Sequence, residues 1–401
     1  MTLRRLIFWL HLVTGLTVGL IIASLAITGA IMTFQAQIID WAERGSHITA
    51  PTSQTCVSPS TILTNAAHLQ NSAPTGLTLY SDPHQPAEVV LGQDAVVLVN
   101  PCDGKVIGPG ANRLRHFFQA TRDLHRWVAL RGVRHETLRQ IKNAAVLGFL
   151  FLILSGLVIW FPRQLTWKHL RPAVLFRGGL HGRAREWNWH NVFGFWMSLP
   201  LALITLSGII MAYPWANNLL YRAAGTPLPP DRAEMAPKRS KPLAADKFST
   251  LDLAILKAIH QDSGWKSLSL RLPAGKDPNV TFTLDEGEGG RPQQRAQLVV
   301  ARKDGQVIRW EPFSKNPRGR QWRLYARFLH TGELFGIPGR LVALSAMIGA
   351  LMLVWTGCSL SLRRFASWRR RRYAHRGIPP RKESAEARDD TCLKFCCSPH
   401  F

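Results

Sequence analysis

Four long apolar segments constrain the fold of this chain more than any other feature of its sequence. They cover residues 6–34, 144–161, 192–213 and 341–362. Each reaches or approaches the roughly 20 residues that an α-helix needs to cross a bilayer. The sequence therefore predicts a membrane protein with four transmembrane helices, and the lipid bilayer is its first expected partner.

The first segment also has features of a secretory signal peptide. Arg4 and Arg5 precede an apolar run that ends in small residues. This run is longer than the apolar region of a usual signal, and the third segment, in mid-chain, is a close copy of it. We therefore expect the first segment to be retained as a membrane anchor.

Basic residues predict the orientation of these helices. The chain has a formal net charge of +25 at pH 7, and such an excess is also typical of proteins that bind nucleic acid through its phosphates. Here, however, lysine and arginine concentrate in the short loop 163–189 and in the tail after residue 362, as expected for cytoplasmic ends of membrane helices. We expect both termini in the cytoplasm of a bacterial inner membrane and no nucleic-acid partner. The arginine-rich segment 113–142 would lie outside, because long loops cross the membrane largely regardless of charge.

Two of the apolar segments repeat one another at identical spacing. His11 opens the first segment, which closes with Thr-Gly-Ala-Ile-Met at 28–32. His190 opens the third, which closes with Ser-Gly-Ile-Ile-Met at 207–211. The chain thus looks like one unit written twice.

A second repeated pattern lies before the second and fourth apolar segments. It reads Arg, six residues, Arg, one residue, Leu-His, and it comprises Arg115, Arg122 and His125 in the first copy and Arg320, Arg327 and His330 in the second. Because the first helix of each unit starts on the same side, we expect a tandem parallel duplication with its axis along the membrane normal.

The two long loops between the apolar segments are predicted to be small α+β domains. Each begins with a helical pattern (60–69; 251–261), continues with strand-like alternation and turns through Asp-Gly at 103–104 or 304–305. We therefore expect four membrane helices, at 1–36, 143–162, 190–214 and 336–362. Between them lie a periplasmic domain at 37–142, a cytoplasmic loop at 163–189 and a second periplasmic domain at 215–335, which contains a linker at 224–247. A basic cytoplasmic tail follows at 363–401.

The chain resembles the PepSY-associated transmembrane proteins. The resemblance covers residues 4–364, from Arg-Arg-x-x-Phe-Trp-Leu-His at 4–11 to Leu-His-Thr-Gly-Glu-Leu-Phe-Gly at 329–336. The chain is similar to family members that act as inner-membrane ferric-siderophore reductases. This similarity implies PepSY-like periplasmic domains and electron transfer through b-type haem to ferric complexes outside the inner membrane. No Gly-x-Gly-x-x-Gly follows a predicted strand, so no nicotinamide or flavin domain is expected.

The four matched histidines are the predicted ligands of two b-type haems. A haem that only carries electrons needs both axial positions filled, and neutral imidazole suits them. We expect His11 and His190 to bind one iron near the inner face, and His125 and His330 to bind a second near the outer face. The alternative is that these histidines contact only lipid headgroups and water, as a single histidine at a helix end usually does. The occurrence of four histidines in matched pairs favours ligation. His116 and His135 lack partners in the other copy and are interpreted as surface residues, although either would replace His125 if the alignment shifts.

Four arginines are the predicted partners of the haem propionates. Arg122 and Arg327 lie one turn before His125 and His330 and share their helix face, and arginine binds carboxylates through two parallel hydrogen bonds. Arg115 and Arg320, two turns further back, are expected to do the same or to meet an anionic siderophore. Contact with lipid headgroups is the alternative.

Six cysteines add little to this prediction. Cys56 and Cys102 share the first external loop and are able to pair in an oxidising compartment. The tail cysteines, Cys392, Cys396 and Cys397, lack the spacing of a metal site.

The leading hypothesis is a haem oxidoreductase that reduces periplasmic ferric iron, as a ferric-siderophore (ferric-chelate) reductase supplied by an unidentified cytoplasmic or quinol donor. The alternatives are a membrane-anchored PepSY regulator of a peptidase or sensor, and a carrier of iron or haem without redox turnover.

Overall fold

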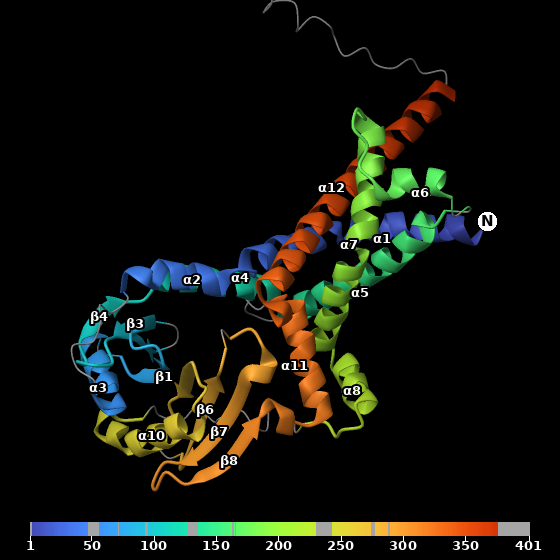
Figure 1. Cartoon of the computed structure of the whole chain (residues 1–401). Helices are drawn as coiled ribbons and strands as arrows, with labels where there is room; N and C mark the ends of the chain where they lie inside the picture. Colours follow the sequence, from blue (N-terminus) through green and yellow to red (C-terminus); the bar gives the residue numbers. More distant parts are fainter. Residues whose placement is uncertain are drawn as a thin grey trace, which may run out of the picture.

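Four long helices form the membrane-embedded part of the chain in this computed structural model (Figure 1). They are α1 (Leu3–Met32), α5 (His135–Trp160), α7 (Gly182–Ala212) and α12 (Gly336–His375). Each is long and apolar enough to cross a bilayer, as the four apolar segments predict. The structure describes residues 2–46, 56–70, 72–92, 95–126, 135–162, 164, 166–229, 243–273, 277–287 and 289–375.

The helices extend beyond the apolar segments of the sequence. Helix α5 begins at His135, α7 begins at Gly182 and α12 continues to His375. The extra turns are polar, so hydrophobicity alone does not reveal them. Residues 230–242 of the expected linker and residues 376–401 of the tail, with its three cysteines, lie outside the described part of the chain.

Small residues allow the four helices to pack closely. Ala26 of α1 and Ala346 and Ala350 of α12 are fully buried, together with Leu201 of α7. Partly buried Met197 and Met347 fill the space around them. Backbones that approach over small side chains gain dispersion contacts and hold the helices in register.

One end of the bundle gathers the N-terminus of α1 and the C-terminus of α12. The Arg4 guanidinium donates to the Phe161 carbonyl just after α5, at 3.1 Å, and Arg363 of α12 pairs with the buried Glu186 of α7 at 3.0 Å. Helices α1 and α7 therefore run in one direction, and α5 and α12 run in the other. Figure 1 shows the strands beyond the opposite end of the bundle, away from the N-terminus.

Eight antiparallel strands make one continuous sheet in the order β4-β3-β2-β1-β5-β6-β7-β8. The strands are β1 (Pro74–Tyr80), β2 (Ala87–Leu91), β3 (Ala95–Val99), β4 (Val106–Pro109), β5 (Ser267–Arg271), β6 (Asn279–Asp285), β7 (Arg295–Ala301) and β8 (Val307–Pro312). The predicted Asp-Gly turns precede the last strand of each half. Gly104 and Gly305 have φ of +71° and +69°, which only glycine adopts without strain.

The two predicted α+β domains are joined through their first strands. Thr78 of β1 lies opposite Ser269 of β5, and their hydroxyls are 3.2 Å apart. The pairing satisfies two strand edges that separate domains would leave exposed. The two predicted α+β units therefore share one continuous sheet, of which each supplies four strands.

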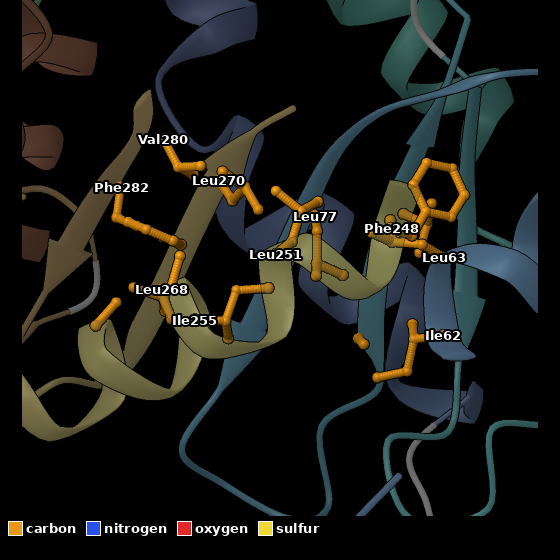
Figure 2. Close-up of a cluster of buried hydrophobic side chains, with 14 of the residues drawn as sticks. Ile62, Leu63, Leu77, Phe248, Leu251, Ile255, Leu268, Leu270, Val280 and Phe282 are labelled. Atoms are coloured by element: carbon orange, nitrogen blue, oxygen red, sulfur yellow. The ribbon is translucent and has the colours of Figure 1, made fainter. Parts of the chain in front are cut away.

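Both halves contribute to a single core (Figure 2). Leu63 of α3 (Pro59–Gln70) and Leu77 of β1 come from the first half. Phe248 of η2 (Ala245–Leu251), Ile255 of α10 (Asp252–Gln261) and Leu268 of β5 come from the second. The Ser60 hydroxyl also donates to the Asp252 carboxylate at 2.6 Å, which ties α3 to α10.

Short helices connect the sheet to the bundle. They are α2 (Gln35–Glu43), α4 (Asn112–Arg126), α8 (Pro214–Ala223) and α11 (Arg318–His330), and at the other end α6 (Trp167–Val174) packs on α7. Helix α4 follows β4 and α11 follows β8. The two edge strands of the sheet are thus each followed by a helix that returns to the bundle.

Cys56 and Cys102 lie side by side at the edge of the first half. Their Sγ atoms are 3.5 Å apart and both side chains are thiols. The two cysteines are thus close together, as their ability to pair requires.

Candidate functional site: two levels of histidines in the helix bundle

The four predicted histidines lie at two levels of the bundle. His11 of α1 and His190 of α7 lie near the end that holds the N-terminus. His125 and His330 lie in the last turns of α4 and α11, near the sheet. Residues 11 and 28 of α1 are 17 positions apart, which at 1.5 Å per residue separates the two levels by about 25 Å.

Each histidine contacts a hydroxyl group on a neighbouring membrane helix. The contacts from ring Nδ1 to hydroxyl oxygen are His11 to Ser155 at 2.8 Å, His125 to Thr28 at 2.8 Å, His190 to Thr356 at 2.9 Å and His330 to Ser207 at 3.4 Å. All four hydroxyls also donate to backbone carbonyls one turn earlier in their own helices. The backbone contact of each hydroxyl therefore holds it in position independently of its contact with the histidine.

A glycine follows every one of these hydroxyl residues. A Cβ on Gly29 or Gly208 would lie 3.7 or 3.1 Å from Cε1 of His125 or His330. On Gly156 and Gly357, the corresponding distances to His11 and His190 are both 3.4 Å. The glycines thus provide the space in which each imidazole lies flat against its neighbouring helix.

The protonation of His330 follows from its second contact. Its Nδ1 lies 2.9 Å from the backbone carbonyl of Ile204. A carbonyl oxygen only accepts, so Nδ1 carries the hydrogen and Nε2 presents its lone pair. The backbones of Leu25 and Leu353, each three residues before the hydroxyl residue, contact His125 and His190 in the same way. This arrangement is typical of metal-binding histidines, whose ring N–H is held by an outer partner.

We call His125 and His330, which lie nearer the sheet, the upper pair, and His11 and His190 the lower pair. The two rings of the upper pair are close neighbours. The ring centroids of His125 and His330 are 6.3 Å apart, with an angle of 65° between planes. The two rings are therefore close enough to act on one bound group together. Burial and, next, the charge of His330 lower the pKa of His125 to about 3, so the ring is neutral, as a metal ligand must be.

The rings of His11 and His190 lie at the other level, where His11 contacts Ser155 of α5 and His190 contacts Thr356 of α12. In the described part of the chain, no three His, Cys, Asp or Glu side chains gather at one place. Two imidazoles alone are too few to hold a bare ion, but they are the complete axial set of a haem. The residues present therefore fit haem better than an isolated metal.

Arginines surround the upper histidines. Arg122 donates to the side-chain oxygens of Gln35 and Gln119, both at 3.1 Å, and no ion pair with a carboxylate is found for it among the described residues. Burial and the nearby Arg295 lower the pKa of Arg327, against the effect of Glu333, and Arg126 and Arg122 lower it further. This cluster of guanidinium groups favours an anion beside the upper pair.

Arg115 and Arg320, the first arginines of the repeated pattern, lie toward the sheet rather than toward the histidines. Arg115 pairs with Glu43 at 2.9 Å and with Glu88 at 3.3 Å. Arg320 donates to Gln297 at 3.0 Å and lies 3.6 Å from Glu311. Both therefore pair with carboxylates of the protein, whereas the contacts of Arg122 among the described residues are with the amide oxygens of Gln35 and Gln119. His116 is exposed on α4, and the side chain of His135 lies outside the described residues.

Sequence reasoning missed the hydroxyl partners. The sequence alone led to no prediction for Ser155 or Thr356. The signal is a Ser-Gly or Thr-Gly pair on every membrane helix, at 28–29, 155–156, 207–208 and 356–357. It becomes visible once these pairs are compared with the histidines of other helices.

Comparison with protein families matches residues 8–364 to the model of the PepSY-associated TM region. Comparison with curated proteins gave no match. The family match spans nearly the whole chain, including all four histidines and all four hydroxyl–glycine pairs.

Proposed function

Because the chain belongs to the PepSY-associated transmembrane family, we propose that it is an inner-membrane haem oxidoreductase that reduces ferric iron on the periplasmic side. The observation that carries this proposal is the set of four histidines whose Nδ1 atoms are held by hydroxyls, in two pairs about 25 Å apart along the helices. A protein that only anchors a regulatory domain needs no such pairs.

His11 and His190 would hold one haem b, and His125 and His330 the other. When bound, haem supplies reversible one-electron transfer at an iron that has no free position for oxygen. The four hydroxyls keep Nδ1 occupied and leave Nε2 for the iron. Arg122 and Arg327 would bind propionates beside the upper haem, because their guanidinium groups lack carboxylate partners of their own.

The sheet would lie in the periplasm, with both termini in the cytoplasm. Arg4 and Arg363 lie at the end of the bundle where α1 begins and the last turns of α12 lie, and arginine prefers the cytoplasmic side of a membrane. The like direction of α1 and α7 and the equal strand order in both halves of the sheet support a tandem parallel duplication. Each copy would then give one ligand to each haem.

The acceptor would be a ferric siderophore, and the donor a quinol or a cytoplasmic reductase. One electron converts Fe(III) to Fe(II), which hard oxygen ligands hold far less tightly. Release from the siderophore would therefore follow reduction. The support for this substrate is the resemblance to siderophore reductases alone.

The test is the haem content of full-length protein purified in detergent. We expect two b-type haems per chain, about one after His330→Ala or His11→Ala, and two after His116→Ala, which alters an exposed histidine on α4. A reduced-minus-oxidised spectrum without b-type bands would refute the proposal and favour the regulator. Reduction of a ferric siderophore by dithionite-reduced protein in stopped flow then tests the acceptor.

A further inference from the structure

A cavity of about 190 Å³ lies where the sheet region meets the start of α12. Its polar lining comes from three places: Gln37 of α2, Lys266 and Arg291 of the second half of the sheet, and Glu333 and Arg340 of the segment that enters the membrane. The volume equals that of about six water molecules. A phosphate or a small carboxylic acid therefore fits inside.

Arg340 is the central residue of this cavity. Its side chain is only 5 % exposed, yet its Nε and Nη1 atoms have no hydrogen-bond partner. Among the described residues of the lining, the carboxylate is that of Glu333, which lies 3.8 Å from Nη2, too far for a hydrogen bond. A buried guanidinium with two free donors is costly unless something satisfies it.

The other polar groups of the lining add positive charge. Arg291 and Lys266 contribute two more cations, against the single carboxylate of Glu333. Nη2 of Arg340 lies 3.7 Å from where a Cβ on Gly290 would stand, and Nη2 of Arg291 lies 4.0 Å from the same point on Gly336. The two guanidinium groups thus approach the loop and the helix start that line the cavity.

We propose that this cavity is a binding site for an oxyanion, a phosphate or carboxylate group that Arg340 holds with its two free donors and that Arg291 and Lys266 help to attract. Guanidinium binds both groups through paired hydrogen bonds. The group belongs either to a soluble anion from outside the membrane or to the head of an anionic lipid. The proposal is independent of the haem proposal, because the binding residues include none of the four histidines.

The test is isothermal titration calorimetry on the full-length protein as purified in a maltoside detergent, in chloride buffer at constant ionic strength. The probes are inorganic phosphate, citrate and the short-chain lipid dihexanoyl phosphatidylglycerol. We expect at least one probe to bind, and Arg340→Gln to weaken its affinity roughly 10- to 100-fold, the usual effect of losing charge-assisted hydrogen bonds. Arg309→Gln is the matched control, because Arg309 is an exposed arginine of the same sheet.

Two further variants test the cavity if the protein with Arg340→Gln does not fold. Arg291→Gln, at an exposed position, is expected to weaken binding about threefold, and Glu333→Gln is expected to strengthen it by removing the opposing charge. Binding of phosphate or citrate alone identifies a soluble anion, and binding of the lipid alone identifies a headgroup. Either result supports the site. Absence of binding by all three probes, or equal binding in the wild type and in both arginine-to-glutamine variants of the cavity, overturns it.

Discussion

At the residue scale, the hydroxyl of Thr28 is expected to strengthen haem binding at the proposed site of His125 and His330. Thr28→Val keeps the shape of the side chain and removes the hydroxyl oxygen that accepts the hydrogen bond from Nδ1 of His125. Loss of such an outer partner commonly lowers metal-site affinity about 10- to 100-fold. We expect one of the two haems to be lost faster to apomyoglobin after Thr28→Val, and near wild-type retention after Thr28→Ser. Equal retention in both variants would show that the hydroxyl has only a packing role.

Glycine at position 208 is expected to matter for the same site. The added methyl of Gly208→Ala would lie 3.1 Å from His330 Cε1, closer than ordinary contact. The ring must then move away from the axis shared with His125. Low-temperature electron paramagnetic resonance should report an altered or missing signal for one haem. Gly194→Ala, on the same helix with its nearest neighbour at 3.7 Å, should leave both signals unchanged.

Tyr80 makes the sheet sensitive to alkaline pH. Burial and the adjacent Glu88 raise its pKa well above the usual value of 10, and its hydroxyl donates to Glu88 at 2.8 Å. The folded protein therefore holds this proton more tightly than the unfolded chain, so the stabilisation is complete below pH 10 and declines as pH rises above it. We expect the thermal midpoint of the wild type to fall more steeply above pH 10 than that of Tyr80→Phe. Parallel curves would contradict this.

At the element scale, the β1–β5 pairing should make the sheet unfold as one unit. Leu77 of β1 is fully buried, opposite Leu270 of β5, and Leu-to-Ala changes at such positions cost about 2–5 kcal/mol. After Leu77→Ala, hydrogen exchange should accelerate in β2–β3 and β6–β7 together. Leu256→Ala, on the exposed side of α10, should change neither. Acceleration confined to β2–β3 would mean that the halves are independent.

The elements themselves were largely predictable, and their joining was not. Apolar run length predicts the four membrane helices, and alternation with Asp-Gly turns predicts the strands and hairpins. Each of these signals is local. The β1–β5 pairing depends on two similar strands 190 residues apart meeting edge to edge, which no local pattern encodes. The histidines were predictable because they repeat, whereas Ser155 and Thr356 become meaningful only when the helix partners are known.

At the scale of the whole molecule, orientation in the membrane is the next quantity to measure. Alkaline phosphatase fused after residue 224 should be active if the sheet is periplasmic, since the enzyme folds only where its disulfides form. The same fusion after residue 375 should be inactive, and a fluorescent protein fused there should be bright. The reverse pattern at both points would invert the proposed direction of electron transfer.

Helices α1 and α7 each carry a histidine at one level and a hydroxyl at the other, with 17 positions between them on both helices. A helix turns by 100° for each residue, so adding or removing one residue within either interval would rotate one contact away while leaving the other in place. The length of these two intervals is therefore as fixed as the identity of the residues at their ends. A substitution inside either interval leaves this spacing unchanged, whereas the insertion or deletion of one residue would disturb it.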